Sequence, residues 1–280
     1  SQEYRNAIDV MTTETTCLSS IWETDEKTEQ YFQQHGRDDA YRCLKVNDGT
    51  YYDRCIDLDL SEVECMIALP MHPSLAIPIN TFKKDPKKYL KEAEEHANAQ
   101  LAHKNMDLVS KVKEDGTVIV NQGVIAGCSG GTYGNIMAAS AILNDGDCGN
   151  GEFRLSIYPD SMPVYKALVE NGTVASLIST GAIFREAFCG PCFGAGDTPA
   201  NNAFSIRHST RNFPNREGSK IQNGQISSVA LMDARSIAAT AANKGFLTAA
   251  DEFTGTYTKP AYHFDKKIYE NRVFDSKGVA

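Results

Sequence analysis

The fold is decided by residues 118–143, which have the sequence VIVNQGVIAGCSGGTYGNIMAASAIL. An apolar run over 118–126 is followed by a glycine-rich turn over 127–132 and then by a stretch rich in Ala, Ile and Met over 133–143. A short apolar run that ends at glycines predicts a buried strand, and the longer apolar stretch predicts a buried helix. This strand–turn–helix unit places Cys128 directly after a strand.

The same alternation continues toward the C-terminus. We expect strands over 154–158, 183–188, 203–207 and 229–232, and helices over 162–170 and 234–242. Strands that alternate with helices are typical of a parallel sheet covered by helices on both faces, so we expect an α/β fold with three α/β/α layers and mostly parallel sheets. Ligands of such sheets bind at the carboxyl ends of the strands, where both Cys128 and the pair Cys189 and Cys192 are expected.

The first hundred residues show a less regular pattern. Residues 25–34 predict a polar helix that ends at Gly36. Residues 55–67 predict a strand region, because Ile56, Leu58 and Leu60 alternate with charged residues. Residues 83–105 predict a highly charged helix with few apolar positions, which we interpret as a solvated surface helix or linker. It is the best candidate for a domain boundary.

Composition excludes several classes of protein. A net charge of −8 and a pI of about 5.3 over 280 residues disfavour a general nucleic-acid binder. No apolar stretch approaches the roughly 18–20 residues of a membrane span. The N-terminal residues are not those of a signal peptide and lack an initiator Met, which suggests processing or a fragment of a longer protein. We expect a cytoplasmic protein without a nucleic-acid or membrane partner.

Eight cysteines are too few for a disulfide scaffold in a chain of this length, which favours a reducing compartment. Free cysteines are often buried as small hydrophobic residues. We predict that role for Cys17, Cys43, Cys55, Cys65 and Cys148.

The turn around Cys128 places a thiol at the N-terminus of a helix. Backbone N–H groups at such a position stabilise a thiolate or an anionic ligand. A nucleophilic cysteine, a phosphate cradle, a metal ligand and a simple tight turn are all compatible with this segment alone.

The second chemical segment is Cys189-Gly-Pro-Cys192. Its spacing lets two thiolates reach one metal centre, but the same four residues occur in thioredoxin-type redox motifs, which open a helix. Gly194, Gly196 and Pro199 follow at once and disfavour a long helix. Zinc would need a further ligand. His208 is the nearest candidate, although a surface histidine is the simpler interpretation.

The third segment is Ser209-Thr-Arg-Asn-Phe-Pro-Asn-Arg216. Arg211 and Arg216 lie in a loop after a predicted strand. The planar guanidinium group binds carboxylates through two parallel hydrogen bonds, so the two residues are compatible with a carboxylate clamp, but this segment alone favours an exposed basic loop.

Together the three segments resemble the aconitase and isopropylmalate isomerase superfamily. That family has a Gly-Ser-Cys-Thr-Asn turn, a C-x-x-C motif about sixty residues later and an Asn-Arg-Asn-Phe-x-x-Arg segment about twenty residues beyond. Here Cys128 and Cys189 are 61 residues apart, and Arg211 follows Cys192 by 19. Residues 52–62 resemble the family's Tyr-Asp-x-x-Ile-Glu-Ile-Asn-Leu-Ser-Glu stretch, and Thr15-Thr16 resembles its Ala-Thr-Thr segment.

The resemblance implies that Cys128, Cys189 and Cys192 hold three irons of a [4Fe–4S] cluster. The fourth iron, which has no protein ligand, would act as a Lewis acid on a hydroxy-carboxylic acid. Arg211 and Arg216 would bind the carboxylates of a small di- or tricarboxylic hydroxy acid, and no catalytic base is expected in this chain.

The resemblance also implies an internal fragment that covers the second and third domains of a hydratase or dehydratase. We expect a second-domain-like α/β segment over 1–82, a charged linker over 83–106 and a cluster-binding α/β/α domain over 107–280. The missing N-terminal and C-terminal domains would be its partners. We therefore expect no activity from this chain alone.

Three residues depart from the family pattern. Gly130 and Thr210 replace asparagines, and alignment on Thr15-Thr16 puts Met11 where the family has a glutamate. These changes keep open a non-catalytic iron–sulfur or iron-sensing protein of the same family. A thioredoxin-like oxidoreductase that uses only Cys189 and Cys192 is a third hypothesis.

Overall fold

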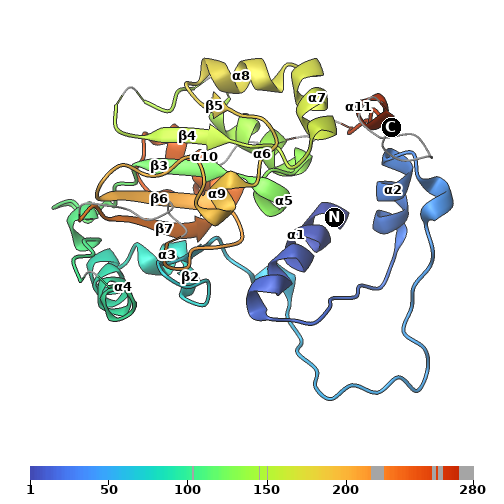
Figure 1. Cartoon of the computed structure of the whole chain (residues 1–280), viewed down its shortest axis with the longest axis horizontal. Coiled ribbons are helices and arrows are strands. Elements are labelled where there is room, and N and C mark those ends of the chain that lie inside the picture. The colour runs from blue at the N-terminus through green and yellow to red at the C-terminus, as the bar shows by residue number, and fades with distance from the viewer. Residues whose placement is uncertain are drawn as a thin grey trace, which may run out of the picture.

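The structure is a computed structural model that describes residues 1–102, 104–144, 146–149, 151–215, 224–253, 257 and 261–270. Its centre is a seven-stranded sheet with the order β2-β1-β7-β6-β3-β4-β5 (Figure 1). The strands are β1 (Met66–Ala68), β2 (Ala76–Pro78), β3 (Gln122–Ile125), β4 (Arg154–Ile157), β5 (Ile183–Phe184), β6 (Ala203–His208) and β7 (Ser227–Met232). Strands β3 to β7 are parallel, whereas β1 pairs antiparallel with both β7 and β2. The expected α/β fold with a mostly parallel sheet is confirmed.

All five predicted helices are present, and side-chain caps explain where several helices begin. Asp25 accepts hydrogen bonds from the N–H groups of Lys27 and Thr28 at the start of α2, and Asp233 caps α10 in the same way. The helices are α1 (Gln2–Met11), α2 (Glu26–Gln34), α3 (Ile79–Phe82), α4 (Pro86–Gln100), α5 (Gly127–Gly130), α6 (Tyr133–Leu143), α7 (Met162–Glu170), α8 (Thr173–Ser179), α9 (Gly190–Phe193), α10 (Ala234–Ala242) and α11 (Lys267–Glu270).

The two faces of the central strands have different covers. Helices α6 and α10 pack together on one face, and Gly123 lies so close to α10 that a Cβ atom there would be 2.9 Å from Ile237 Cγ2. The opposite face carries the polar side chains of Gln122, Ser205 and Arg207. It is covered by the segment that contains α9, which lies in front of the sheet in Figure 1. Hydrogen bonds from Gln122 and Arg207 attach this segment to the sheet.

The predicted strand over 55–67 is wrong for most of its length. Only residues 66–68 form a strand, and Ile56 is 91% exposed in the long excursion between α2 and β1 (Figure 1). Alternation of apolar and charged residues therefore does not identify a buried strand here, because no described strand pairs with these residues.

The charged helix is also more buried than expected. Leu90 and Ala97 of α4 are fully buried, and Glu94 accepts hydrogen bonds from the N–H groups of Leu108 and Val109. Strands β1 and β2, which precede this helix, join the same sheet as the strands that follow it. The strands before and after residues 83–106 therefore belong to one sheet. The division into 1–82, 83–106 and 107–280 stays a prediction.

The cysteine prediction holds only in part. Cys148 is buried and Cys65 is half-buried, but Cys17, Cys43 and Cys55 are exposed. Each of these three lies in a segment that contributes no residue to the hydrophobic core. Across the described part of the chain, no helix is both long and apolar enough to cross a membrane.

Candidate metal centre

Three thiols gather at the carboxyl edge of the parallel strands. Cys128 follows β3 within α5. After β5, Cys189 immediately precedes α9, and Cys192 lies within α9. A Cβ atom on Gly127 would lie 2.9 Å from Cys192 Sγ, so the backbone just before Cys128 passes directly beside the Cys192 thiol. In addition to desolvation, negative charge at Cys189 raises the pKa of both Cys128 and Cys192, which indicates that the three sulfurs share one electrostatic environment.

Desolvation by the surrounding protein is the main cause that raises the pKa of each of these two thiols, although Cys192 is buried whereas Cys128 keeps an exposed surface. Desolvation brings the pKa of Cys192 to about 11, although the Thr210 N–H donates to its sulfur and the Arg207 charge favours its thiolate. The N–H groups of Cys128 and Ser129 point at the Cys128 sulfur and lower its pKa, but burial and Cys189 outweigh them. A metal centre would supply the positive charge that stabilises these thiols in their ionised form.

The donor set fits an iron–sulfur cluster in its chemistry. Soft thiolates select clusters of this kind, and each thiolate of a cluster binds a different iron. Within the described residues, no three His, Cys, Asp or Glu side chains are close enough to share a single metal ion. Ser129 Oγ, next to Cys128, is buried without a hydrogen-bond partner, and a cluster sulfide would give it an acceptor. Cys128, Cys189 and Cys192 are therefore the residues that would hold a cluster.

Arg211, which follows β6, lies in an ion pair. Its Nε atom is 2.8 Å from Oε1 of Glu14, although the geometry is not that of a hydrogen bond. The Glu14 side chain is only 9% exposed. The neighbouring Asn212 donates hydrogen bonds to the carbonyl oxygens of Ala68 and Leu69, which attach the loop to β1. The predicted partner of Arg211, Arg216, lies outside the described residues.

Glu14 is a contact of the predicted site residue Arg211 that the sequence analysis does not identify. We expected Met11 at the position of an acidic residue from the N-terminal segment. The structure instead brings Glu14, three residues later, to Arg211. The signal in the sequence is a single acidic residue among four threonines at the end of α1, which favours no particular role until the fold places it.

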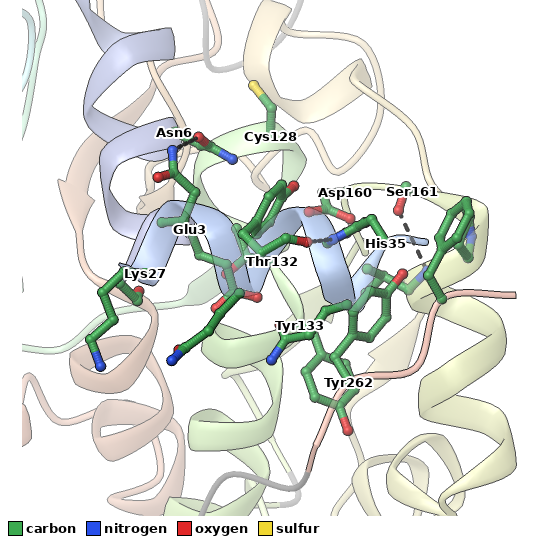
Figure 2. Close-up of a pocket in the computed structure, with 18 of the residues that line it drawn as sticks. Glu3, Asn6, Lys27, His35, Cys128, Thr132, Tyr133, Asp160, Ser161 and Tyr262 are labelled. Atoms are coloured by element: carbon green, nitrogen blue, oxygen red, sulfur yellow. Dashed lines mark hydrogen bonds between the residues drawn. The ribbon is translucent and has the colours of Figure 1, made fainter. Parts of the chain in front are cut away.

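A cavity of about 510 Å³ opens beside Cys128, between α1, α2 and the start of α6. Figure 2 shows Cys128 at its rim, with Asn6 and Glu3 on one side and Asp160 on the other. The Asp160 carboxyl faces the cavity, and the surrounding protein and the nearby Glu3 raise its pKa to about 6. Polar groups therefore line the space next to the thiol.

The family of the chain is established by comparison with known proteins. Residues 1–239 match the Aconitase family (aconitate hydratase). The chain belongs to the aconitase family. It is 27% identical over 253 residues to the 3-isopropylmalate dehydratase large subunit of Moorella thermoacetica and 24% identical to that of Clostridium kluyveri, covering 90% of this chain and 50% of each relative. The same subunit of Picrophilus torridus is 28% identical over 75% of this chain and 42% of its own. The chain thus spans about half the length of the curated relatives it matches.

One departure of this aconitase-family chain, at Gly130, has a structural explanation in His208. This residue is not the surface histidine we expected: its Nδ1 atom accepts a hydrogen bond from the Ala234 N–H, and burial lowers its pKa to about 4. A Cβ atom on Gly130 would lie 2.3 Å from the His208 carbonyl oxygen. The asparagine of the family pattern therefore has no room at position 130. Thr210, the other replacement, contributes its backbone N–H to Cys192.

Proposed function

We propose that this chain forms the cluster-holding part of an aconitase-family hydro-lyase, with Cys128, Cys189 and Cys192 as the ligands of a [4Fe–4S] cluster. The observation that carries the proposal is the convergence of the three thiols at one edge of the sheet, where charge on one raises the pKa of the others. When bound, the cluster supplies an iron without a protein ligand, which acts as a Lewis acid on a substrate hydroxyl.

The substrate we infer is a small di- or tricarboxylic hydroxy acid. Arg211 would bind one carboxylate, with Glu14 fixing the orientation of its guanidinium group, and Arg216 would bind another. The relatives are named for isopropylmalate, a compound of this class. The cavity beside Cys128 offers polar groups for the rest of such a molecule.

The catalyst we propose is larger than this chain. The chain spans about half of its relatives' length, so the catalytic base and further substrate contacts would come from the missing N-terminal and C-terminal domains. Isopropylmalate, citrate and isocitrate should give no turnover with this chain alone. Turnover without added domains would refute the inference that it is an incomplete catalyst.

The ligand assignment can be tested by anaerobic reconstitution with iron and sulfide. The chain should take up close to four irons and four sulfides, and Cys128→Ser, Cys189→Ser and Cys192→Ser should each lower this content sharply. Cys148→Ser is the matched control, because Cys148 is buried away from the three thiols. Undiminished iron in the three site variants would exclude the assignment.

A non-catalytic iron–sulfur or iron-sensing protein is the second candidate. It is favoured by the Glu14–Arg211 ion pair, which occupies a guanidinium group that would otherwise be free for a substrate carboxylate. Calorimetry of the reconstituted chain with isopropylmalate and citrate distinguishes the two. Binding that depends on Arg211 supports the hydro-lyase, whereas the absence of binding together with RNA retention in a filter assay at physiological salt supports the sensor.

A further inference from the structure

Arg207 is fully buried in β6, on the sheet face that the α9 segment covers. Burying a guanidinium group is costly unless its N–H groups are satisfied. Here Nη1 donates to the carbonyl oxygen of Pro191 at 2.8 Å, and Nη2 donates to the carbonyl oxygen of Asp197 at 2.8 Å. These two acceptors lie on the segment that carries Cys189 and Cys192, so one side chain connects that segment to the sheet.

Neighbouring polar groups fix the guanidinium in this position. Gln122 Oε1 accepts from Arg207 Nη2 at 3.3 Å and from Ser205 Oγ at 2.7 Å, while its Nε2 donates to the Asp197 carbonyl oxygen at 3.0 Å. Arg207 Nε donates to Ser205 Oγ at 3.2 Å. The Pro191 and Asp197 carbonyl oxygens, Gln122 Oε1 and Ser205 Oγ are uncharged acceptors, so these contacts leave the positive charge of the guanidinium group beside the turn.

Asp197, which follows α9 on the same segment, is also attached to the sheet through its side chain. The Asp197 carboxylate accepts hydrogen bonds from Ser156 Oγ at 3.0 Å, from Arg154 Nη2 at 3.1 Å and from the Tyr158 hydroxyl. Its side chain is only 1% exposed. Residues 191 and 197 are therefore both anchored to the sheet, and Arg207 is the residue that contacts both.

We propose that Arg207 is the positioning residue of the Cys189-Gly-Pro-Cys192 turn: it holds the Pro191 carbonyl so that the two flanking thiols keep their geometry, and its charge offsets the negative charge of a bound cluster. This inference rests on the proposed function, because the turn needs to hold its geometry only if the thiols bind a metal centre. Arg207 acts through the backbone between the ligands rather than by contact with substrate.

Two substitutions separate geometry from charge. Arg207→Lys keeps the positive charge but loses the forked contact with Pro191 and Asp197. Gln122→Glu keeps the acceptor of Arg207 Nη2 and adds a negative charge beside the guanidinium. It also loses the Nε2 hydrogen bond to the Asp197 carbonyl oxygen, which Arg207 Nη2 still contacts. Arg185→Lys is the control, since Arg185 is 47% exposed and lies 4.0 Å from the Asp197 carboxylate.

Two properties of each reconstituted variant are measured: its iron affinity, by competition with a chelator, and the midpoint potential of its cluster. The melting temperature of each metal-free variant is measured beside them. Loss of a residue that orients metal ligands typically lowers metal affinity by about 10–100-fold, and we expect that loss for Arg207→Lys. Gln122→Glu should lower the midpoint potential and leave iron affinity within a few-fold of wild type, because added negative charge favours the oxidised cluster. Arg185→Lys should change neither.

The outcomes separate this inference from the proposed function. A wild-type chain that takes up no iron refutes the proposed function itself. A wild-type chain that binds iron, together with an Arg207→Lys variant of unchanged melting temperature and unchanged iron affinity, refutes only the role of Arg207. If Arg207→Lys does not fold, Gln122→Glu decides the question, and an unchanged midpoint potential then contradicts the inference.

Discussion

A Cβ atom on Gly130 would lie 2.3 Å from the carbonyl oxygen of His208, so the turn after Cys128 packs directly onto the end of β6. The obstructing atom belongs to the backbone, and the same carbonyl also accepts the Ala126 N–H at 3.1 Å. We expect Gly130→Ala to lower the free energy of unfolding by about 1–3 kcal/mol, the usual cost of forcing extra atoms into a packed site. Gly130→Asn, which restores the family residue, should cost more.

Urea denaturation of the metal-free chain measures this effect. Gly151→Ala is the matched control, because a Cβ atom there meets nothing within 4 Å. Equal stability of the Gly130 and Gly151 variants would contradict the close approach of the turn to His208. The comparison also shows whether the departure from the family pattern at position 130 is a steric necessity of this chain.

His208 should make the stability of the protein depend on pH. Burial lowers its pKa from 6.5 to about 4, so between these values the unfolded state binds more protons than the folded state. Its contribution to stability is therefore complete above pH 6.5 and is lost as the pH falls toward 4, by up to about 3 kcal/mol. Protonation of Nδ1 would also remove the acceptor for the Ala234 N–H.

The variant that tests this is His208→Asn, whose side-chain oxygen can accept the same N–H but does not titrate. The free energy of unfolding, measured by denaturant titration from pH 4 to 7, should fall less steeply with acid than in the wild type. His263→Asn, at an exposed histidine, should leave the slope unchanged. A wild-type slope in the His208 variant would mean that this histidine is not the group responsible.

Glu14 and Arg211 should be energetically coupled. Their charged groups are 2.8 Å apart, and the Glu14 side chain is largely removed from solvent. In a double-mutant cycle with Glu14→Gln and Arg211→Gln, we expect a coupling energy of about 1–2 kcal/mol, within the range for residues in direct contact. Arg211→Gln alone should be the more damaging change, because it leaves a buried carboxylate without its counter-charge.

The matched pair for this cycle is Lys83 and Glu252, which form an exposed ion pair at the same 2.8 Å separation. Exposed pairs are worth little, so its coupling energy should stay below about 1 kcal/mol. A Glu14–Arg211 coupling no larger than that of the exposed pair would argue against a preorganised guanidinium group at the site.

The parallel part of the fold was predictable because its signals are local. The helices over 133–143 and 234–242 end where their apolar stretches end, and glycines follow the strand that precedes Cys128. The gathering of Cys128 with Cys189 and Cys192 follows from a topological rule, since parallel strands present their carboxyl ends at one edge.

Other features depend on contacts between distant segments, which the sequence does not display. Glu14 reaches Arg211 across 197 residues of chain, and only the fold brings them together. Arg207 resembles any strand residue until burial and its hydrogen bonds with Pro191 and Asp197 are known. The alternation of Ile56, Leu58 and Leu60 misled because a strand pattern needs a partner strand, and none pairs with these residues in the described ranges.

The segment over residues 56–60 tests directly whether an alternating sequence pattern implies burial. Ile56, Leu58 and Leu60 are 91%, 67% and 70% exposed, so their replacement by serine removes almost no buried apolar surface. The triple variant should keep its free energy of unfolding within about 0.5 kcal/mol per substitution. Ile67→Ala is the comparison, because Ile67 in β1 is fully buried and its truncation should cost about 2–5 kcal/mol.

Three exposed apolar side chains also favour association between molecules, so sedimentation velocity should show less concentration-dependent assembly for the triple variant. A large loss of stability in that variant would mean that the segment packs against the protein in solution, as its alternating sequence first indicated.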